Sequence, residues 1–278
     1  KEIGFPNISE DELGGINWEK FSEQKCKKIL KKPELDSNKY ASGKVLIIAG
    51  SKGMTGAAIL STSAALRSGA GLTITTTPSS LNYIYEKNLI EGITFPLPDE
   101  DRGYLDISHY YSIMEKVEWA DSVLIGPGLG REKSTQLLIK KLVESISKPL
   151  IIDADGLFPY SGSLNELSNK ITPLIITPHF GEFSRLINIT VQNIVSNFPT
   201  IMEDTLKVFN HTLLIKQVPI CTLNRNEAVV NVTGSPGLAT AGTGDILSGI
   251  LASFLSSGLN SFDVAAVGAF VQGKSSDK

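Results

Sequence analysis

Short runs of apolar and β-branched residues, separated by stretches with helical spacing, constrain the fold of this chain more than any other feature. Such runs are too short for helices and suit strands covered on both faces, as in a parallel sheet. The sequence therefore predicts an α/β fold with a mostly parallel central sheet and helices on both faces. The expected strands are 44–50, 72–77, 122–126, 149–153, 174–178 and 212–216, and an antiparallel hairpin, 220–223 and 228–232, is expected at the edge.

The remaining patterns place helices and loops between these strands. Residues 91–103, which contain two prolines, are expected to form a loop. Residues 1–43 are polar and are predicted to be an approach segment with one short helix near 18–31, whereas 44–278 form one domain. Helices are expected at 57–69, 79–87, 107–117, 132–146 and 199–210, after His179, after Asp245 and from Asp263 onward.

Composition excludes several classes of function. The net charge of −3 over 278 residues leaves no basic surface for nucleic acid or an acidic membrane. No apolar run approaches the roughly 18 residues that a membrane span needs. The two cysteines are far apart and match no metal-site spacing, so a cytoplasmic location is expected. The chain lacks an initiator Met, and we expect it to be trimmed from something longer.

Residues 231–255 carry the strongest functional pattern. A stretch rich in glycine, threonine and serine leads into an apolar pattern with helical spacing, so 241–244 should lie just before a helix and Asp245 in its first turn. A helix start presents unpaired N–H groups, and glycines let an anion approach them, so this stretch predicts a phosphate cradle. Asp245 beside it suits a general base. The alternative is that Asp245 only caps the helix and complements its dipole.

Glycines and carboxylates follow the predicted strands at the edge where open α/β sheets bind ligands. Residues 126–130 follow one strand, and Asp153 and Asp155 follow the next. The two carboxylates could meet Mg²⁺ or a sugar hydroxyl, or one could cap a turn. Residues 50–56 lack the Gly-Lys-Ser/Thr ending of a P-loop, which leaves a substrate-contacting loop or a plain strand–loop–helix.

Two of the three histidines, His109 and His179, have different predicted roles. His109 lies in a predicted helix and is expected to pack or face solvent rather than bind a ligand. His179 follows a strand, and its spacing from Glu182 and Arg185 puts the three on one helical face. We expect His179 to contact a ligand, with a purely structural role as the alternative.

Together these motifs resemble the ribokinase-like fold and, within it, the ADP/ATP-dependent NAD(P)H-hydrate dehydratases. That family forms the C-terminal half of the bifunctional nicotinamide nucleotide repair enzymes. The resemblance covers 44–273 in the order of the family and is carried by 50–58, 67–72, 126–130, 153–156, 177–183, Lys216 and 237–245.

The resemblance implies a reaction in which ATP or ADP, with Mg²⁺, phosphorylates the ring hydroxyl of NADH or NADPH hydrate, and loss of phosphate restores NAD(P)H. Asp245 would be the catalytic base and also touch the substrate. The implied nucleotide-binding residues are Lys216, Gln217, Val218, Pro219, Ile220, Gly242, Thr243 and Gly244. The implied substrate-binding residues are Ala58, Gly128, Gly130, His179, Glu182 and Arg185. No metal-ligating residue is assigned.

The resemblance also implies partners and admits competitors. A homo-oligomer, a tetramer in the family, is implied, as is fusion to or pairing with an NAD(P)H-hydrate epimerase, because residues 2–6 resemble the joint that follows that domain. A kinase of the same fold, acting on a vitamin precursor or sugar, fits the cradle and Asp245 equally well. A non-catalytic nucleotide sensor is the third candidate, supported by Gln217, which stands where the family usually has Gly.

Overall fold

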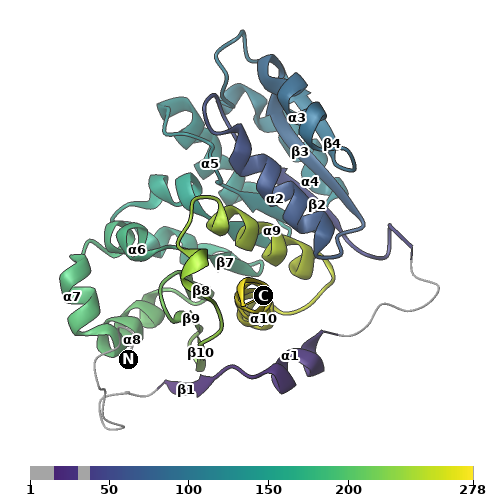
Figure 1. Cartoon of the computed structure of the whole chain (residues 1–278). Coiled ribbons are helices and arrows are strands. Elements are labelled where there is room, and N and C mark those ends of the chain that lie inside the picture. The colour runs from purple at the N-terminus through teal and green to yellow at the C-terminus, as the bar shows by residue number, and fades with distance from the viewer. Residues whose placement is uncertain (1–15, 31–37, 278) are drawn as a thin grey trace.

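A ten-stranded sheet crosses the part of the chain that the computed structural model describes, residues 16–30 and 38–277 (Figure 1). Its strand order is β1-β10-β9-β8-β7-β6-β5-β2-β3-β4, and all neighbours are parallel except β10 with β9 and β9 with β8. The strands are β1 (Asn17–Lys20), β2 (Lys44–Ile48), β3 (Leu72–Pro78), β4 (Ile93–Leu97), β5 (Ser122–Ile125), β6 (Leu150–Ile152), β7 (Leu174–Ile176), β8 (Thr212–Ile215), β9 (Ile220–Leu223) and β10 (Glu227–Asn231).

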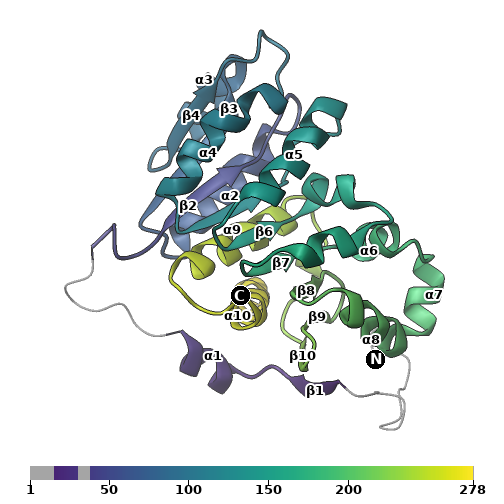
Figure 2. The same cartoon turned by 180° about the vertical axis from the view of Figure 1, so that it is seen from behind.

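Helices cover both faces of the sheet, as the views from opposite sides show (Figures 1 and 2). The α-helices are α1 (Glu23–Ile29), α2 (Thr55–Arg67), α3 (Asn82–Asn88), α4 (Tyr110–Trp119), α5 (Lys133–Ser145), α6 (Phe180–Ile187), α7 (Val191–Ser196), α8 (Phe198–Val208), α9 (Thr243–Ser256) and α10 (Ser261–Ser276). Short 3₁₀ helices, η2 (Ser79–Leu81), η3 (Ile107–His109), η4 (Ala154–Tyr160), η5 (Leu164–Asn169) and η6 (Pro236–Leu238), fill several connections. The predicted α/β architecture is confirmed.

Alternation along the central strands explains the two-sided core. In β2, Leu46 and Ile48 belong to the cluster that includes residues of α4, α5, α6 and α8, whereas Val45 and Ile47 belong to the cluster that includes residues of α2, α9 and α10. All four side chains have 0% exposure. Successive strand residues point to opposite faces, so a strand covered on both faces must be apolar throughout.

Two edge strands depart from the predictions. Residues 17–20, predicted to begin a helix, form β1, which pairs with β10, and only Glu23–Ile29 is helical. Lys31, the predicted end of that helix, and residues 2–6 lie outside the described residues. Ile93–Leu97, predicted as loop, forms edge strand β4; Pro96 is tolerated there because an edge strand has one side without a ladder partner.

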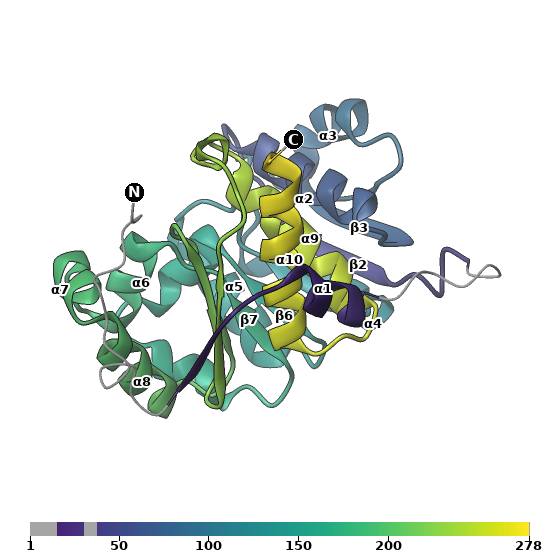
Figure 3. The same cartoon turned by 60° about the horizontal axis from the view of Figure 1, so that its bottom comes forward.

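The segment from β1 to α1 lies across α10 (Figure 3). Phe21 packs against Phe270 of α10 with ring centroids 5.5 Å apart, in a cluster that also holds Cys26, Val229 and Phe262. These residues therefore belong to the folded body and do more than lead into it. The hairpin of β9 and β10 is confirmed, with β1 as the strand outside it. No helix in the described ranges is long and apolar enough to span a membrane.

Candidate active site

The first turn of α9 forms the centre of the candidate site. Gly242 caps the helix with φ 90°, a left-handed conformation in which side chains other than glycine are strained. The first helical hydrogen bond runs from the Ile246 N–H to the Gly242 carbonyl (3.0 Å), so the N–H groups of Thr243, Gly244 and Asp245 precede the regular ladder. The predicted position of Asp245 in the first turn is confirmed. Such a turn can receive the oxygens of a phosphate.

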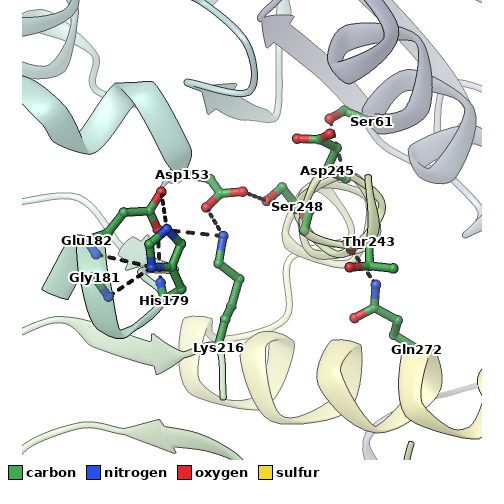
Figure 4. A network of polar contacts seen from close by, with 11 residues as sticks. Ser61, Asp153, His179, Gly181, Glu182, Lys216, Thr243, Asp245, Ser248 and Gln272 are labelled. Carbon is green, nitrogen blue, oxygen red and sulfur yellow. Dashed lines mark hydrogen bonds and ion pairs between the residues drawn. The ribbon is translucent and has the colours of Figure 1, made fainter. Parts of the chain in front are cut away.

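Neighbouring helices hold this turn from two sides. Gln272 of α10 donates its side-chain N–H to the Thr243 carbonyl (2.6 Å), and Ser61 of α2 donates its hydroxyl to the Asp245 carbonyl (3.0 Å) (Figure 4). A Cβ on Gly249 would lie 2.1 Å from the Ser61 carbonyl, so α2 and α9 approach more closely than any side chain would allow. The turn is therefore fixed by the protein before any ligand arrives.

The Asp245 carboxyl lies in an environment that disfavours its charge. Its pKa is raised from 3.8 to about 6, chiefly by burial and next by the charge of Asp153; Lys216 opposes the rise, and Asp155 adds a smaller increase. No side chain makes a capping hydrogen bond at the start of α9, although Asp245 is an acidic residue in the first turn and so complements the helix dipole. A carboxylate that ionises near pH 6 is deprotonated at neutral pH yet holds a proton more strongly than an ordinary aspartate, as a general base requires.

Asp153 joins the ends of two strands to α9. Its side chain is 1% exposed; one carboxylate oxygen accepts from Lys216 Nζ (2.5 Å) and the other from Ser248 Oγ (2.6 Å) (Figure 4). Lys216 Nζ also lies 4.0 Å from Glu182 Oε2. Burial lowers the pKa of Lys216, but the charges of Asp153 and then Glu182 outweigh it and raise the pKa overall. Lys216 is therefore a cation, with 18% of its side chain exposed, held beside the proposed cradle.

His179 caps α6. Its Nδ1 accepts hydrogen bonds from the N–H groups of Gly181 (2.9 Å) and Glu182 (3.2 Å), while Glu182 Oε2 accepts from the His179 N–H (2.9 Å). Because Nδ1 accepts, the neutral ring carries its proton on Nε2, which lies 3.4 Å from Glu182 Oε1. The His179 side chain is 53% exposed. The structural role of His179 is thus present in the fold, and a ligand contact through Nε2 stays a prediction.

Two glycine-rich loops meet beside this network. The Gly50 N–H donates to the Pro127 carbonyl (2.8 Å), and Ser51 Oγ donates to the Gly128 carbonyl (2.8 Å). The Gly130 N–H donates to Asp155 Oδ2 (3.0 Å), which ties the second loop to the segment after β6. The loops therefore lie at the same sheet edge as Asp245, as predicted. His109 is 4% exposed and packs inside the protein, as expected.

Several predicted site residues lie apart from the central network. Ala58 is 0% exposed, and this burial counts against direct side-chain contact with a ligand. Arg185 is exposed and lines a recess beside Glu182 with Arg131 and Phe158. Gln217, Val218 and Pro219 lie in the connection between β8 and β9, and Ile220 is the first residue of β9. Ala241 stands where the family motif that Asp245 ends usually begins with Gly; its φ is not positive, so alanine causes no backbone strain there.

The sequence did not reveal the roles of three polar residues in this region. Asp153 was interpreted as a metal or hydroxyl ligand or as a cap, but its side chain makes no capping hydrogen bond and instead holds Lys216 and Ser248. Ser248 was not singled out, and Gln272 was noted only as standing where the family often has His. Ser248 carried a signal, since it is a polar residue three positions after Asp245 and lies on the same side of the helix.

Comparisons with known proteins agree with this geometry. Residues 45–278 match the NAD(P)H-hydrate dehydratase family. A bifunctional NAD(P)H-hydrate repair enzyme from Moorella thermoacetica is 34% identical over 91% of this chain and 48% of its own length. The enzyme of that name from Dictyoglomus turgidum is 34% identical over 99% of this chain and 53% of its own length. The chain thus spans about half the length of these relatives.

Solved structures show the same fold. A ribokinase-like superfamily protein from Enterococcus faecalis has a TM-score of 0.77 at 26% identity, over 94% of this chain and 87% of its own. An ADP/ATP-dependent NAD(P)H-hydrate dehydratase from Bacillus subtilis, co-crystallised with ATP and Mg²⁺, has a TM-score of 0.75 at 22% identity, over 94% and 88%. By its sequence match and its ribokinase-like fold, this chain belongs to the NAD(P)H-hydrate dehydratase family.

Proposed function

We propose that this chain removes water from hydrated NADH or NADPH, with ATP or ADP consumed. The observation that carries the proposal is Asp245, a carboxyl whose pKa is raised to about 6, chiefly by burial, and which lies in the first turn of a helix, where the N–H groups precede the regular hydrogen-bond ladder. Asp245 takes the proton of the ring hydroxyl while the hydroxyl oxygen attacks the terminal phosphoryl group of the nucleotide, and ATP leaves as ADP, or ADP as AMP. Phosphate, a far better leaving group than hydroxide, then departs with loss of a ring proton and restores NAD(P)H.

The N–H groups around Gly242, Thr243 and Gly244 would hold the transferred phosphoryl group, with Lys216 supplying positive charge beside them. A Cβ on Gly244 would lie 3.4 Å from Lys216 Nζ, which supports this placement. Within the described ranges, no group of three or more His, Cys, Asp or Glu side chains could hold a metal ion. Mg²⁺ would therefore arrive bound to the phosphates of the nucleotide, where it supplies charge neutralisation.

The remaining assignments stay proposals of the same kind. Gln217, Val218, Pro219 and Ile220 would line the adenine-nucleotide side, next to Lys216. His179, Glu182 and Arg185, with the loop that holds Gly128 and Gly130, would receive the hydrated dinucleotide. The exposed ring of His179 and the exposed side chain of Arg185 support contact with a ligand from solvent.

The relatives suggest how the activity is organised. The relatives from Moorella thermoacetica and Dictyoglomus turgidum are bifunctional and about twice the length that this chain matches. We therefore propose that an epimerase that interconverts the hydrate epimers is fused to this domain or works beside it. A homo-oligomer, a tetramer as in the family, and a cytoplasmic location belong to the same proposal, as does an organisation in which residues 44–278 form the catalytic domain.

One assay tests the proposed function. The protein is incubated with ATP or ADP, Mg²⁺ and chemically hydrated NADH or NADPH, and absorbance near 340 nm reports the restored dihydronicotinamide ring. Absorbance should rise with either or both nucleotides, and Asp245→Asn should lower the rate about a hundredfold or more. Consumption of ATP with a vitamin precursor or sugar, and none with the hydrate, would instead support a kinase. ATP binding with no turnover of any substrate would support a nucleotide sensor.

A further inference from the structure

Asp153 occupies a position that connects the charges of the site with the helix that carries Asp245. We propose that Asp153 is a positioning residue for Asp245, which it serves by holding Lys216 beside the cradle, by anchoring α9 through Ser248, and by its own negative charge. The inference rests on the proposed function only in taking Asp245 as the base. Its evidence is the pair of hydrogen bonds to Asp153, 2.5 Å from Lys216 Nζ and 2.6 Å from Ser248 Oγ.

The geometry gives each of the two bonds a separate effect. Ser248 lies one helical turn after Asp245 and also donates to the Gly244 carbonyl (3.1 Å), so its bond to Asp153 fixes the orientation of the first turn of α9. The bond to Asp153 holds the Lys216 ammonium group in one position, from which its charge acts on Asp245. Both oxygens of a carboxylate accept hydrogen bonds, and each oxygen of this buried side chain has a partner from a different element, so Asp153 ties the end of β8 to α9.

The charges around Asp245 decide the sign of the effect. Asp153 follows β6 and disfavours ionisation of Asp245, Lys216 follows β8 and favours it, and Asp155 in η4 disfavours it more weakly.

Other charged groups act on these three residues. The charge of Asp155 is partly neutralised by Arg131, whose Nε lies 3.1 Å from Asp155 Oδ1. Glu182 in α6, with the His179 ring beside it, lies 4.0 Å from Lys216 and acts on that cation. Removing the charge of Asp153 should therefore make Asp245 a weaker base.

The test is a carboxyl titration that does not depend on turnover. Protein with ¹³C-labelled aspartate is titrated by NMR, and the Asp245 signal is assigned by its loss in Asp245→Asn. Asp153→Asn should lower the pKa of Asp245 by about one unit or more, whereas Lys216→Gln should raise it by a similar amount. Asp155→Asn should produce a shift in the same direction as Asp153→Asn but smaller.

Ser248→Ala is the matched control because it removes a bond to Asp153 and changes no charge. It should leave the pKa of Asp245 within a few tenths of a unit of the wild type, while lowering the maximal rate of dehydration. The acid limb of the rate profile should move to lower pH in Asp153→Asn and stay in place in Ser248→Ala.

Several outcomes would overturn the inference. An unchanged Asp245 titration in Asp153→Asn would reduce Asp153 to a structural residue. If Asp153→Asn does not fold, Lys216→Gln decides alone, because an Asp245 pKa that fails to rise in that variant refutes the coupling. The proposed function fails separately: the predicted shifts in a protein that does not dehydrate the hydrate would uphold the coupling and refute the reaction.

Discussion

Replacement of Asp245 by Asn should stabilise the fold while it removes the activity. The folded protein raises the pKa of this carboxyl from 3.8 to about 6, so ionised Asp245 is less favourable in the folded chain than in the unfolded one. Asparagine is nearly the same size and cannot ionise. The variant therefore keeps the packing of the first turn of α9 and loses the cost of the buried charge.

The magnitude follows from the pKa shift. A rise of about two units corresponds to ~3 kcal/mol at ~1.4 kcal/mol per unit. The side chain is only partly buried, so solvent screening reduces this to about 1–1.5 kcal/mol. Because the folded-state pKa is the higher one, the folded chain binds more protons between about pH 4 and pH 6, and the stability of the wild type falls as pH rises through this window. The gain in the variant should be near zero at pH 4 and complete by pH 7.5.

Urea unfolding of both proteins at pH 4 and pH 7.5 measures the effect. Asp204→Asn is the matched control, since its side chain is 66% exposed and its change should stay within ~0.5 kcal/mol at both values. An Asp245→Asn variant that is less stable than the wild type at pH 7.5 would contradict the raised pKa of Asp245 in the folded protein. An equal difference in stability at both pH values would contradict it too.

Three further predictions concern the rate and the cradle. The kcat/KM for dehydration should rise with pH to a midpoint near 6 and then level off, because Asp245 must be ionised to accept a proton; a midpoint near 4 would contradict the raised pKa. His179→Ala should raise the KM for the hydrated dinucleotide about tenfold, with a smaller effect on that for ATP or ADP, and His179→Asn should do the same while keeping the cap on α6; steady-state kinetics and thermal unfolding separate the two roles. Gly242→Ala should destabilise the fold by about 1–2 kcal/mol and weaken nucleotide binding in calorimetry, because φ is 90° and the added Cβ would lie 2.6 Å from Leu60 Cδ1.

The parts of the fold that depend on local pattern were predictable from the sequence. The central strands and the hairpin carry apolar runs or alternation that few other structures tolerate, and the start of α9 follows directly from its glycines. The edge strands carried no such signal. Trp18 pairs with Ala228 and Ile93 pairs with Ile74, so β1 and β4 exist because of partners that local sequence does not reveal.

The candidate site shows the same division. Asp245 and the cradle lie within a few residues of each other and were identified together. The bonds of Asp153 join it to Lys216 and Ser248 across 63 and 95 residues of sequence, and no spacing rule reaches that far. His179 was identified by its place after a strand, but its role as the cap of α6 appeared only once the ring was seen to accept two N–H groups.

The sheet order explains why these distant residues meet. β6, β7 and β8 are parallel neighbours, so the segments that leave their carboxyl ends lie side by side at one edge. Asp153 follows β6, His179 follows β7, and Lys216 follows β8 and forms a β-bridge with His179. Lys216 reaches Asp153 past the end of the middle strand, and Ser248 reaches it from α9. The proposed cradle is therefore a local property of the sequence, whereas the charges beside it are a property of the strand order. A chain with the same motifs in a different order would keep the first turn of α9 and lose the electrostatic environment of Asp245.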